Sequence, residues 1–556
     1  MITVSDAYGR FCYLLKLAED YFAAGDFAAA VALAQIAARC AFPDHSGLFA
    51  SPRLERLLLE LGKQVATSRA CGAGRRDENS RNILHVLTYA RPAGGDTRFV
   101  WRWIREDRDN RHSVAITTQD HMKGVYDVPD VLRQAAESSG GFLQTLSASA
   151  SKPMEQAREL RALCQEIDIV ILHLWPYDIV PVLALAAGCD AVKTLFVNHS
   201  DHTFWIGASV SHSVVHLRRQ SPDFLTNRRG LNPNRSSIIP IPLQDSPPSA
   251  TPIQAKRALG YEHDVVLLLT IASPFKYSSP GQISFLDLVT PVLLQFPQAV
   301  LMAVGPQPDD EAWRSASIQT NGRIVALGTR YDNNLRYSAA DIYLDSIPFS
   351  SITSLLEAGS HGVPLLGYRS PNPELGLLGP GAPGLENAMQ LAEDAESYRI
   401  MLTRLVGDAQ FRRQSGELIQ EQIRWLHTGS NWIHTVRDVY AYVDSCNQRG
   451  CMRETCDSFE MTELDTKLSQ LYSHAHDPTH VRRLIRNYVG ALPYWSRLSI
   501  TRRLYLEHFD MSYLNLVPPP LNEIIRYVGR PAYRVIRRLL QPRSLSDLKN
   551  RSEKGC

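Results

Sequence analysis

The chain has 556 residues, of which 44% are hydrophobic and 21% are charged, and its formal net charge is +2. This length exceeds two average domains, and the composition is that of a globular protein. A net charge so close to zero gives no case for nucleic acid or membrane binding through overall charge. No apolar run reaches the roughly 18 residues that a membrane-spanning helix needs.

The cysteines and the first ten residues indicate in which cellular compartment the protein is expected. Nine cysteines are scattered along the chain, and Cys446, Cys451 and Cys456 recur every five residues without forming a CxxC pair. This spacing is typical of neither a zinc site nor a disulfide framework, so we expect reduced thiols and a cytoplasmic protein. The start, MITVSDAYGR, lacks a basic region followed by an apolar core, so no secretory signal is expected.

Residues 1–72 are predicted to form a helical hairpin. Apolar residues recur at helical spacing on both sides of Gly25 and Asp26, and the Ala-rich segment resembles a single tetratricopeptide-type unit. One copy lacks the neighbouring repeats that define such an array. A helix pair that packs on the next domain is an equally good interpretation.

Residues 80–242 are predicted to form a first Rossmann-like domain. A strand over 82–88 is followed by a Gly-rich turn over 93–97 and a helix around 98–105. Apolar strands separated by helical stretches indicate a doubly wound, mostly parallel sheet. The further strands are expected at 113–117, 167–174, 193–198 and 213–217.

Residues 250–430 repeat this α/β pattern after a Pro- and Ser-rich linker, QDSPPSATP. Two such domains in series place the carboxyl ends of two sheets on either side of a cleft, where a ligand is expected. The expected strands cover 265–271, 299–304, 323–327, 342–344 and 363–367.

The segment 340–368 carries the clearest chemistry. A strand ends at Asp345, and Ser and Thr residues precede a helix that starts near Thr353. Free N–H groups and the positive end of the helix dipole suit a diphosphate, and hydroxyl groups add donors. Glu357, one turn further on, is placed to accept both hydroxyls of a ribose. An ordinary βαβ unit in which Ser and Thr only cap the helix is the competing interpretation.

Residues 431–556 are predicted to be a helical C-terminal region. A long amphipathic helix over 425–443 is expected to cross back to the first domain. The last part, from 501, is rich in Lys and Arg, and RPAYRVIRRLLQPR interleaves basic and apolar residues. This tail is either a solvated helix face or a peripheral contact with the inner face of a membrane.

The order of elements over residues 82–445 resembles glycosyltransferases of the GT-B fold, with two Rossmann-like domains facing a cleft and helical extensions at both ends. LLEAGSHGVPLL is similar to the ribose-binding string of the family 4 group, and DSIPFSSITS is similar to a segment of the O-GlcNAc transferases (family 41). Lys276, after the strand in TIASPFK, matches the lysine that neutralises the diphosphate leaving group without a metal; its other interpretation is a solvated loop lysine. The donor-binding residues implied are Lys276, Ser273, Asp345, Thr353, Ser354, Glu357, Gly94 and Gly95.

Two departures from family 4 concern the stereochemistry of transfer. Phe349 occupies the position of a Glu that retaining enzymes carry eight residues before the ribose Glu, and Ala272 and Ser273 stand where an Arg usually precedes the lysine. These two departures favour a transfer that inverts the anomeric configuration, or a diverged group of transferases with its own donor contacts.

The candidate base lies in VNHSDHTFWIG, after a strand of the first domain. An inverting transferase needs a base at the acceptor hydroxyl, and His199, Asp201 and His202 are the candidates, with His173 as another strand-end histidine. No DxD motif ends a strand at the expected diphosphate position, so no metal or cofactor is expected.

We therefore expect a glycosyltransferase that moves a hexosyl or N-acetylhexosaminyl group from a nucleotide sugar, a UDP-sugar by resemblance, to a glycan, lipid-linked glycan or protein. The alternatives are a nucleotide-sugar 2-epimerase and a GT-B domain that acts as a non-catalytic partner protein.

Overall fold

The computed structural model describes residues 3–65, 80–92, 94–119, 127–187, 189, 191–244, 250–277, 284–450, 452–453, 460–473 and 479–509. The chain forms two compact units, Met1–Asp477 and Pro478–Cys556. In its described part the second unit contains α17 (His480–Tyr488) and α18 (Tyr494–Leu506). The division into four domains made from the sequence stays a prediction.

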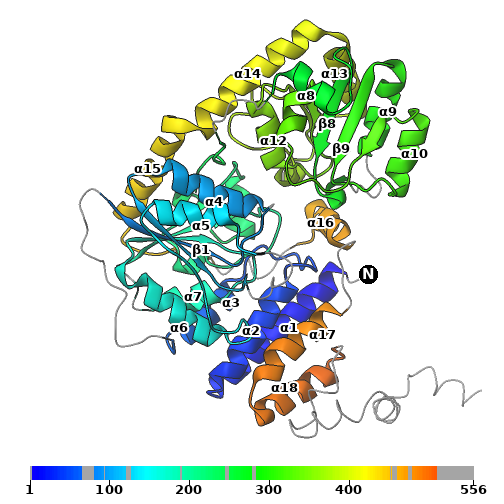
Figure 1. Ribbon diagram of the computed structural model, residues 1–556. Coiled ribbons are helices and arrows are strands. Elements are labelled where there is room, and N and C mark those ends of the chain that lie inside the picture. Colours follow the sequence, from blue (N-terminus) through cyan, green and yellow to red (C-terminus); the bar gives the residue numbers. More distant parts are fainter. Residues whose placement is uncertain are drawn as a thin grey trace, which may run out of the picture. The chain divides into compact units, whose positions relative to one another are not determined.

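The first sheet has seven strands in the order β3-β2-β1-β4-β5-β6-β7, and every neighbouring pair is parallel. In Figure 1, α4 and α5 lie over one face of this sheet and α6 and α7 over the other. The strands are β1 (Asn82–Leu87), β2 (Arg111–Ile116), β3 (Leu143–Thr145), β4 (Ile169–His173), β5 (Lys193–Asn198), β6 (Ser213–His216) and β7 (Ser236–Ile238). The helices are α4 (Gly95–Glu106), α5 (Asp130–Ser138), α6 (Pro153–Leu163) and α7 (Val180–Leu185).

The second sheet has six parallel strands in the order β10-β9-β8-β11-β12-β13. Its central strands are almost wholly apolar because helices cover both faces. The strands are β8 (Val266–Ile271), β9 (Ala299–Val304), β10 (Ile324–Ala326), β11 (Ile342–Leu344), β12 (Leu365–Tyr368) and β13 (Gln390–Ala392). The helices are α8 (Pro252–Ala258), α9 (Phe285–Gln295), α10 (Glu311–Gln319), α11 (Asn334–Ala339), α12 (Ile352–Ser360) and α13 (Ala395–Gly407). Two parallel doubly wound sheets confirm the predicted α/β architecture.

The N-terminal helices α1 (Val4–Ala23), α2 (Phe27–Cys40) and α3 (Pro52–Gly62) pack on the first sheet's domain. Glu55 of α3 is buried, and its carboxylate accepts hydrogen bonds from the backbone N–H groups of Gly207, Ala208 and Ser209. A side chain at Gly62 would collide with the backbone of Leu183 on α7. These contacts fit a helix pair that packs on the next domain, one of the two interpretations of this segment.

The sequence predicts one continuous helix over 425–443, and this prediction is wrong. The chain forms α14 (Ala409–His427) and α15 (Gly429–Ser445), which meet at Thr428. Gly429 has a φ of 62°, a left-handed conformation that interrupts a helix and that glycine adopts at little cost. α15 packs against the first sheet, where the Trp432 indole N–H donates to the Pro240 carbonyl at 2.7 Å.

Two further expectations concern thiols and membranes. Cys12, Cys40, Cys164 and Cys446 are free, but Cys189 is disulfide-bonded, so the expectation of reduced thiols is wrong for that residue. Within the described ranges, no helix has the length and apolar character to cross a membrane. The basic tail beyond residue 509 lies outside the described residues, so its membrane contact stays a prediction.

Candidate active site

The site is defined by the points where strand order reverses in each sheet. In the first sheet this point lies between β1 and β4, and in the second between β8 and β11. Ligands of open parallel sheets bind beyond the carboxyl ends of the strands at such points. Most of the residues predicted from the sequence follow β1, β5, β8 and β11.

The start of α12 is a helix end without a side-chain cap. Asp345, directly after β11, is buried, and its Oδ1 accepts from the Ser346 and Ser351 N–H groups at 2.9 and 3.0 Å. Burial raises the pKa of Asp345, although these bonds oppose the rise. Ser351 precedes the helix without a side-chain cap bond to it. The N–H groups of the first turn, which includes Thr353 and Ser354, are therefore not satisfied by a side-chain cap.

Lys276 is brought to the same loop from the end of β8. Its ammonium group donates to the Ser350 carbonyl at 2.8 Å and lies 4.5 Å from the centre of the Phe349 ring. Burial lowers the pKa of Lys276 to about 8, although the Asp345 carboxylate opposes the fall. The lysine therefore lies beside the N-terminus of α12, and its role at a diphosphate stays a prediction. Ser273, three residues earlier, is exposed.

Glu357 has partners that were not expected. Arg98 Nη1 donates to its Oε1 at 2.9 Å, Arg102 Nη2 to the same oxygen at 2.8 Å, and the Tyr337 hydroxyl to Oε2 at 3.2 Å. Only 14% of the Glu357 side chain is exposed. Burial alone would raise the pKa of Glu357, but the charges of Arg98 and Arg102 outweigh it and hold the pKa below its usual value. The carboxylate is thus ionised and bridges the two sheets' domains.

Gly94 and Gly95 lie at the N-terminal end of α4, on the opposite side from α12. Gly94 is the N-cap residue of α4. A Cβ atom placed on Gly95 would lie 3.5 Å from Thr353 Oγ1, so the first turns of α4 and α12 approach each other closely. The N-terminal ends of α4 and α12 therefore lie close together at Gly95 and Thr353, and the Asp96 carboxylate already accepts from the Thr97 N–H of α4 at 2.8 Å.

The candidate bases have different surroundings. Asp201 is buried, and its carboxylate accepts from Asn198 Nδ2 at 2.6 Å and also from Arg218 and Gln220. His199 is partly exposed beside the Phe99 ring, and burial lowers its pKa to about 4, although Asp96 and Asp201 oppose this.

His202 lies apart from that pair, against Phe349 at a centroid distance of 4.4 Å. Burial lowers the pKa of His202 well below its usual value, and Arg218, Lys276 and Arg229 lower it further. His202, Phe349 and Lys276 therefore form one contact group, and His199 belongs to another.

An additional helix, α16 (Glu463–Ser473), covers the His202 group. The ring of Tyr472 stacks on His202 at 6.2 Å, and Leu464, Leu468 and Leu471 join Phe49 and Phe349 in one buried apolar cluster. Asp465 fixes the helix, because it accepts from His45 Nε2 at 2.8 Å and from Arg228 Nη2 at 2.7 Å. The position of α16 could not be predicted, because its sequence pattern is that of any amphipathic helix.

Sequence reasoning also missed Arg98 and Arg102, which lie four residues apart on α4 and therefore on one face. That spacing was a usable signal for a paired carboxylate. In the described part of the chain, no group of three or more His, Cys, Asp or Glu side chains is arranged to hold a metal ion.

No family model and no curated protein matches the sequence. Among solved structures, a glycosyltransferase from Rickettsia africae ESF-5 is 12% identical, with a TM-score of 0.50, over 66% of this chain and 99% of that one. A mutant O-GlcNAc transferase of Thermobaculum terrenum is 16% identical over 80% of this chain and 85% of its own, with a TM-score of 0.47. HepE of Anabaena in complex with UDP and glucose is 14% identical over 66% of this chain and 100% of its own, with a TM-score of 0.48. With its two facing parallel sheets, the chain has the GT-B fold of glycosyltransferases.

Proposed function

We propose that this protein is a glycosyltransferase that moves a sugar from a nucleotide diphosphate to a hydroxyl of a glycan, lipid-linked glycan or protein, without a metal. The observation that carries the proposal is the start of α12, where Lys276 meets an N-terminus that no side chain caps. Cleavage of the sugar–phosphate bond builds negative charge on the diphosphate, and a fixed ammonium group beside a positive helix end stabilises that charge. UDP is the nucleotide that the resemblance of residues 345–357 implies.

The transferred group is proposed to be a hexosyl or N-acetylhexosaminyl unit. The donor sits between the first turns of α12 and α4, with the Thr353 and Ser354 hydroxyls on the β-phosphate and the close backbone of Gly95 opposite. A carboxylate has about four lone-pair directions, and the bonds from Arg98 to both oxygens, from Arg102 and from Tyr337 already take up four. For Glu357 to bind the ribose hydroxyls, the ribose must therefore replace at least one of these protein donors.

The test is titration calorimetry with UDP, followed by UDP-sugar turnover. Lys276→Met should lower kcat by about 10²- to 10³-fold, the usual cost of losing one group that stabilises transition-state charge. Lys152→Met removes an exposed lysine that pairs with Glu155 and serves as the matched control. Unchanged turnover in Lys276→Met would contradict the site. An epimerised nucleotide sugar formed without an acceptor would favour the 2-epimerase instead.

A non-catalytic partner protein is the second candidate, because one observation favours it. Glu357 is held by two arginines, and Phe349, an apolar residue, fills the position of the family 4 glutamate. If titration calorimetry detects no heat of binding with UDP, with GDP or with dTDP, this second candidate is supported.

A further inference from the structure

Four histidines form a continuous row across the first sheet. His112 lies on β2, His85 on β1, His173 at the end of β4, and His199 directly after β5. His85 pairs with Val114, two residues beyond His112, and His173 pairs with Leu87, two residues beyond His85. The offset from His173 on β4 to His199 after β5 is also two residues, because Leu172 pairs with Phe196. A step of two keeps all four side chains on one face, and the row ends at the carboxyl edge.

Each histidine contacts the next through ring nitrogens. His112 Nδ1 lies 3.0 Å from His85 Nε2, His85 Nδ1 lies 3.0 Å from His173 Nε2, and His173 Nδ1 lies 2.9 Å from His199 Nε2. His85, His112 and His173 are buried. Burial lowers the pKa of His85 and of His173 well below the usual value, and the neighbouring histidines lower both further. Near neutral pH these two rings are therefore uncharged, with one N–H and one lone pair each.

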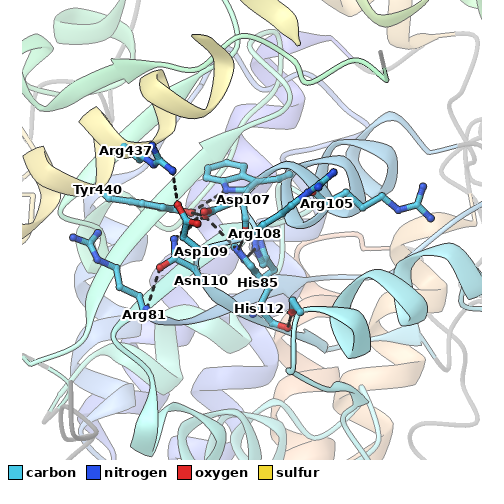
Figure 2. Close-up of polar contacts among 12 residues, drawn as sticks. Arg81, His85, Arg105, Asp107, Arg108, Asp109, Asn110, His112, Arg437 and Tyr440 are labelled. Atoms are coloured by element: carbon cyan, nitrogen blue, oxygen red, sulfur yellow. Dashed lines mark hydrogen bonds and ion pairs between the residues drawn. The ribbon is translucent and has the colours of Figure 1, made fainter. Parts of the chain in front are cut away.

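The first ring fixes the direction of the whole row. His112 Nε2 faces the Asp107 carbonyl oxygen at 3.1 Å and Asp107 Oδ2 at 3.3 Å. The carboxylate also accepts from the Tyr440 hydroxyl at 2.8 Å and from Asn110 Nδ2, as Figure 2 shows. Burial alone would raise the pKa of Asp107, but its bonds with His112, Tyr440 and Asn110 outweigh burial and hold it low. Both oxygens facing His112 therefore only accept, and Nε2 must carry the hydrogen.

The remaining tautomers follow one from another. In its neutral form, with its hydrogen on Nε2, His112 offers the Nδ1 lone pair to His85 Nε2–H, and His85 offers Nδ1 to His173 Nε2–H. His173 then offers Nδ1 to His199 Nε2–H. Neutral His199 is left with its lone pair on Nδ1, at the edge of the sheet where a ligand of this fold binds. Its charged neighbours there are Asp96 and Asp201.

One face of α4 holds the row in place. Phe99 and Trp103 follow each other at helical spacing, and Asp107 is the residue that ends the helix. Phe99 packs on His199 and His173, and Trp103 on His173 and His85, with centroid distances between 5.2 and 6.2 Å. Trp103 also donates from Nε1 to the Tyr440 hydroxyl at 2.9 Å. This packing restricts the rings of His85, His173 and His199.

We propose that His112, His85 and His173 are positioning residues that hold His199 in its Nε2–H tautomer, and that Nδ1 of His199 is the base for the acceptor hydroxyl. This rests on the proposed function. In the step, the hydroxyl proton passes to His199 Nδ1 while the oxygen bonds to the anomeric carbon. The bond from that carbon to the β-phosphate oxygen breaks, and its electron pair leaves with the nucleotide diphosphate. The new imidazolium then keeps its Nε2–H on His173.

The other two candidate bases are less suited to this role. The Asp201 carboxylate already accepts from Asn198, Arg218 and Gln220, so at most one of its about four lone-pair directions is left for an acceptor hydroxyl. His202 lies between the rings of Phe349 and Tyr472, away from the row. Moreover, Arg218, Lys276 and Arg229 all disfavour its protonated form.

The test of the row is ¹⁵N NMR of the full chain with labelled histidine, which distinguishes the two tautomers of each ring. The wild-type protein should carry the His199 hydrogen on Nε2; a hydrogen on Nδ1 would overturn the proposal. His85→Leu removes the central link, and His199 should then populate both tautomers. His85→Gln retains a donor and an acceptor in one side chain and should restore the Nε2–H form. His212→Leu, at a buried histidine of the same domain outside the row, is the control and should leave His199 unchanged.

Turnover tests the base itself. His199→Gln should lower kcat by about 10²- to 10⁴-fold with UDP affinity unchanged, the usual share of a general base. His85→Leu should lower kcat by about 10- to 100-fold, comparable with removing the partner that orients a metal-bound imidazole, and His85→Gln should recover most of it. Full kcat in His199→Gln would overturn the base role. If the wild-type protein binds no nucleotide diphosphate, the proposed function fails and the base role with it, while the NMR result still decides the tautomer.

Discussion

The Glu357 carboxylate on α12 accepts a hydrogen bond from Arg102 Nη2 on α4 at 2.8 Å, so one ion pair joins the two Rossmann-like halves. Both side chains are largely buried, with 10% of Arg102 and 14% of Glu357 exposed. The same carboxylate pairs with Arg98. The residue expected to bind ribose therefore also has a structural role.

Arg102→Met should lower the free energy of unfolding by about 1–3 kcal/mol, because it leaves a charged acceptor with fewer partners. Urea denaturation measures the loss. In the double variant with Glu357→Gln the two losses should not add, since both remove one interaction. Arg413→Ala, which removes an exposed pair with Glu417, should change stability by less than about 0.5 kcal/mol and is the control. Simple additivity of the two losses would contradict the pairing.

The fold could be predicted from the sequence because the apolar runs of parallel strands and the helical periods between them are local signals. The positions of Lys276 after a strand and of Thr353 in the first turn of a helix could be predicted, because the ends of these elements carry local signals such as Pro348 and the small polar residues. The break at Gly429 carried a local signal as well, namely a glycine within a helical pattern.

The histidine row could not be predicted, because no local signal connects its members. His85 and His112 are 27 residues apart, and their contact depends on the register of β1 against β2. A shift of one residue would move either ring to the other face of the sheet. The pairing of Glu357 with Arg98 likewise depends on how two domains pack, over 259 residues of sequence.

Lys276 should set the alkaline limit of turnover. Its protonated form is the one that stabilises the leaving diphosphate, and burial lowers its pKa to about 8. We therefore expect kcat/KM to fall as the pH rises through about 8, whereas kcat should fall at a higher pH, because a bound diphosphate raises the pKa of the ammonium group. The side chain in Lys276→Arg stays charged, so the residual activity of this variant should not show the fall, or alkaline limb, as the pH rises through about 8. A limb that persists unchanged in Lys276→Arg would assign it to another group.

Asp465 should determine how firmly α16 is held. It accepts from His45 and Arg228, and its own backbone segment adds a bond from the Thr462 N–H at 2.9 Å. Asp465→Ala leaves the buried His45 and the Arg228 guanidinium without this acceptor, at a cost of about 1–3 kcal/mol. Hydrogen exchange over residues 463–472 should accelerate, and exchange in β8 should not. Glu463→Ala, at an exposed bond to Asn372, provides the control on the same helix.

Buried histidines should make the protein sensitive to mild acid. Burial lowers the pKa of His216 from 6.5 to about 4, and the pKa values of His85, His173, His199 and His202 are lowered too. Because the unfolded chain binds these protons at a higher pH than the folded one, stability is present above about pH 6.5 and is lost as the pH falls towards 4. For each such histidine, the free energy of unfolding falls by up to about 1.4 kcal/mol for every unit by which the pH is lowered within this window.

Urea denaturation at intervals from pH 7.5 to 5 measures this loss above the range in which most carboxylates titrate. His216→Asn, which keeps a polar side chain beside Asn198, should reduce the slope by about one proton, because it removes a single titrating group. The exposed residue Asp394 offers a matched change, Asp394→Asn, that should leave the slope above pH 5 unaltered. A free energy of unfolding that stays constant from pH 6.5 to 5 would mean that these rings are already accessible to protons in the folded protein.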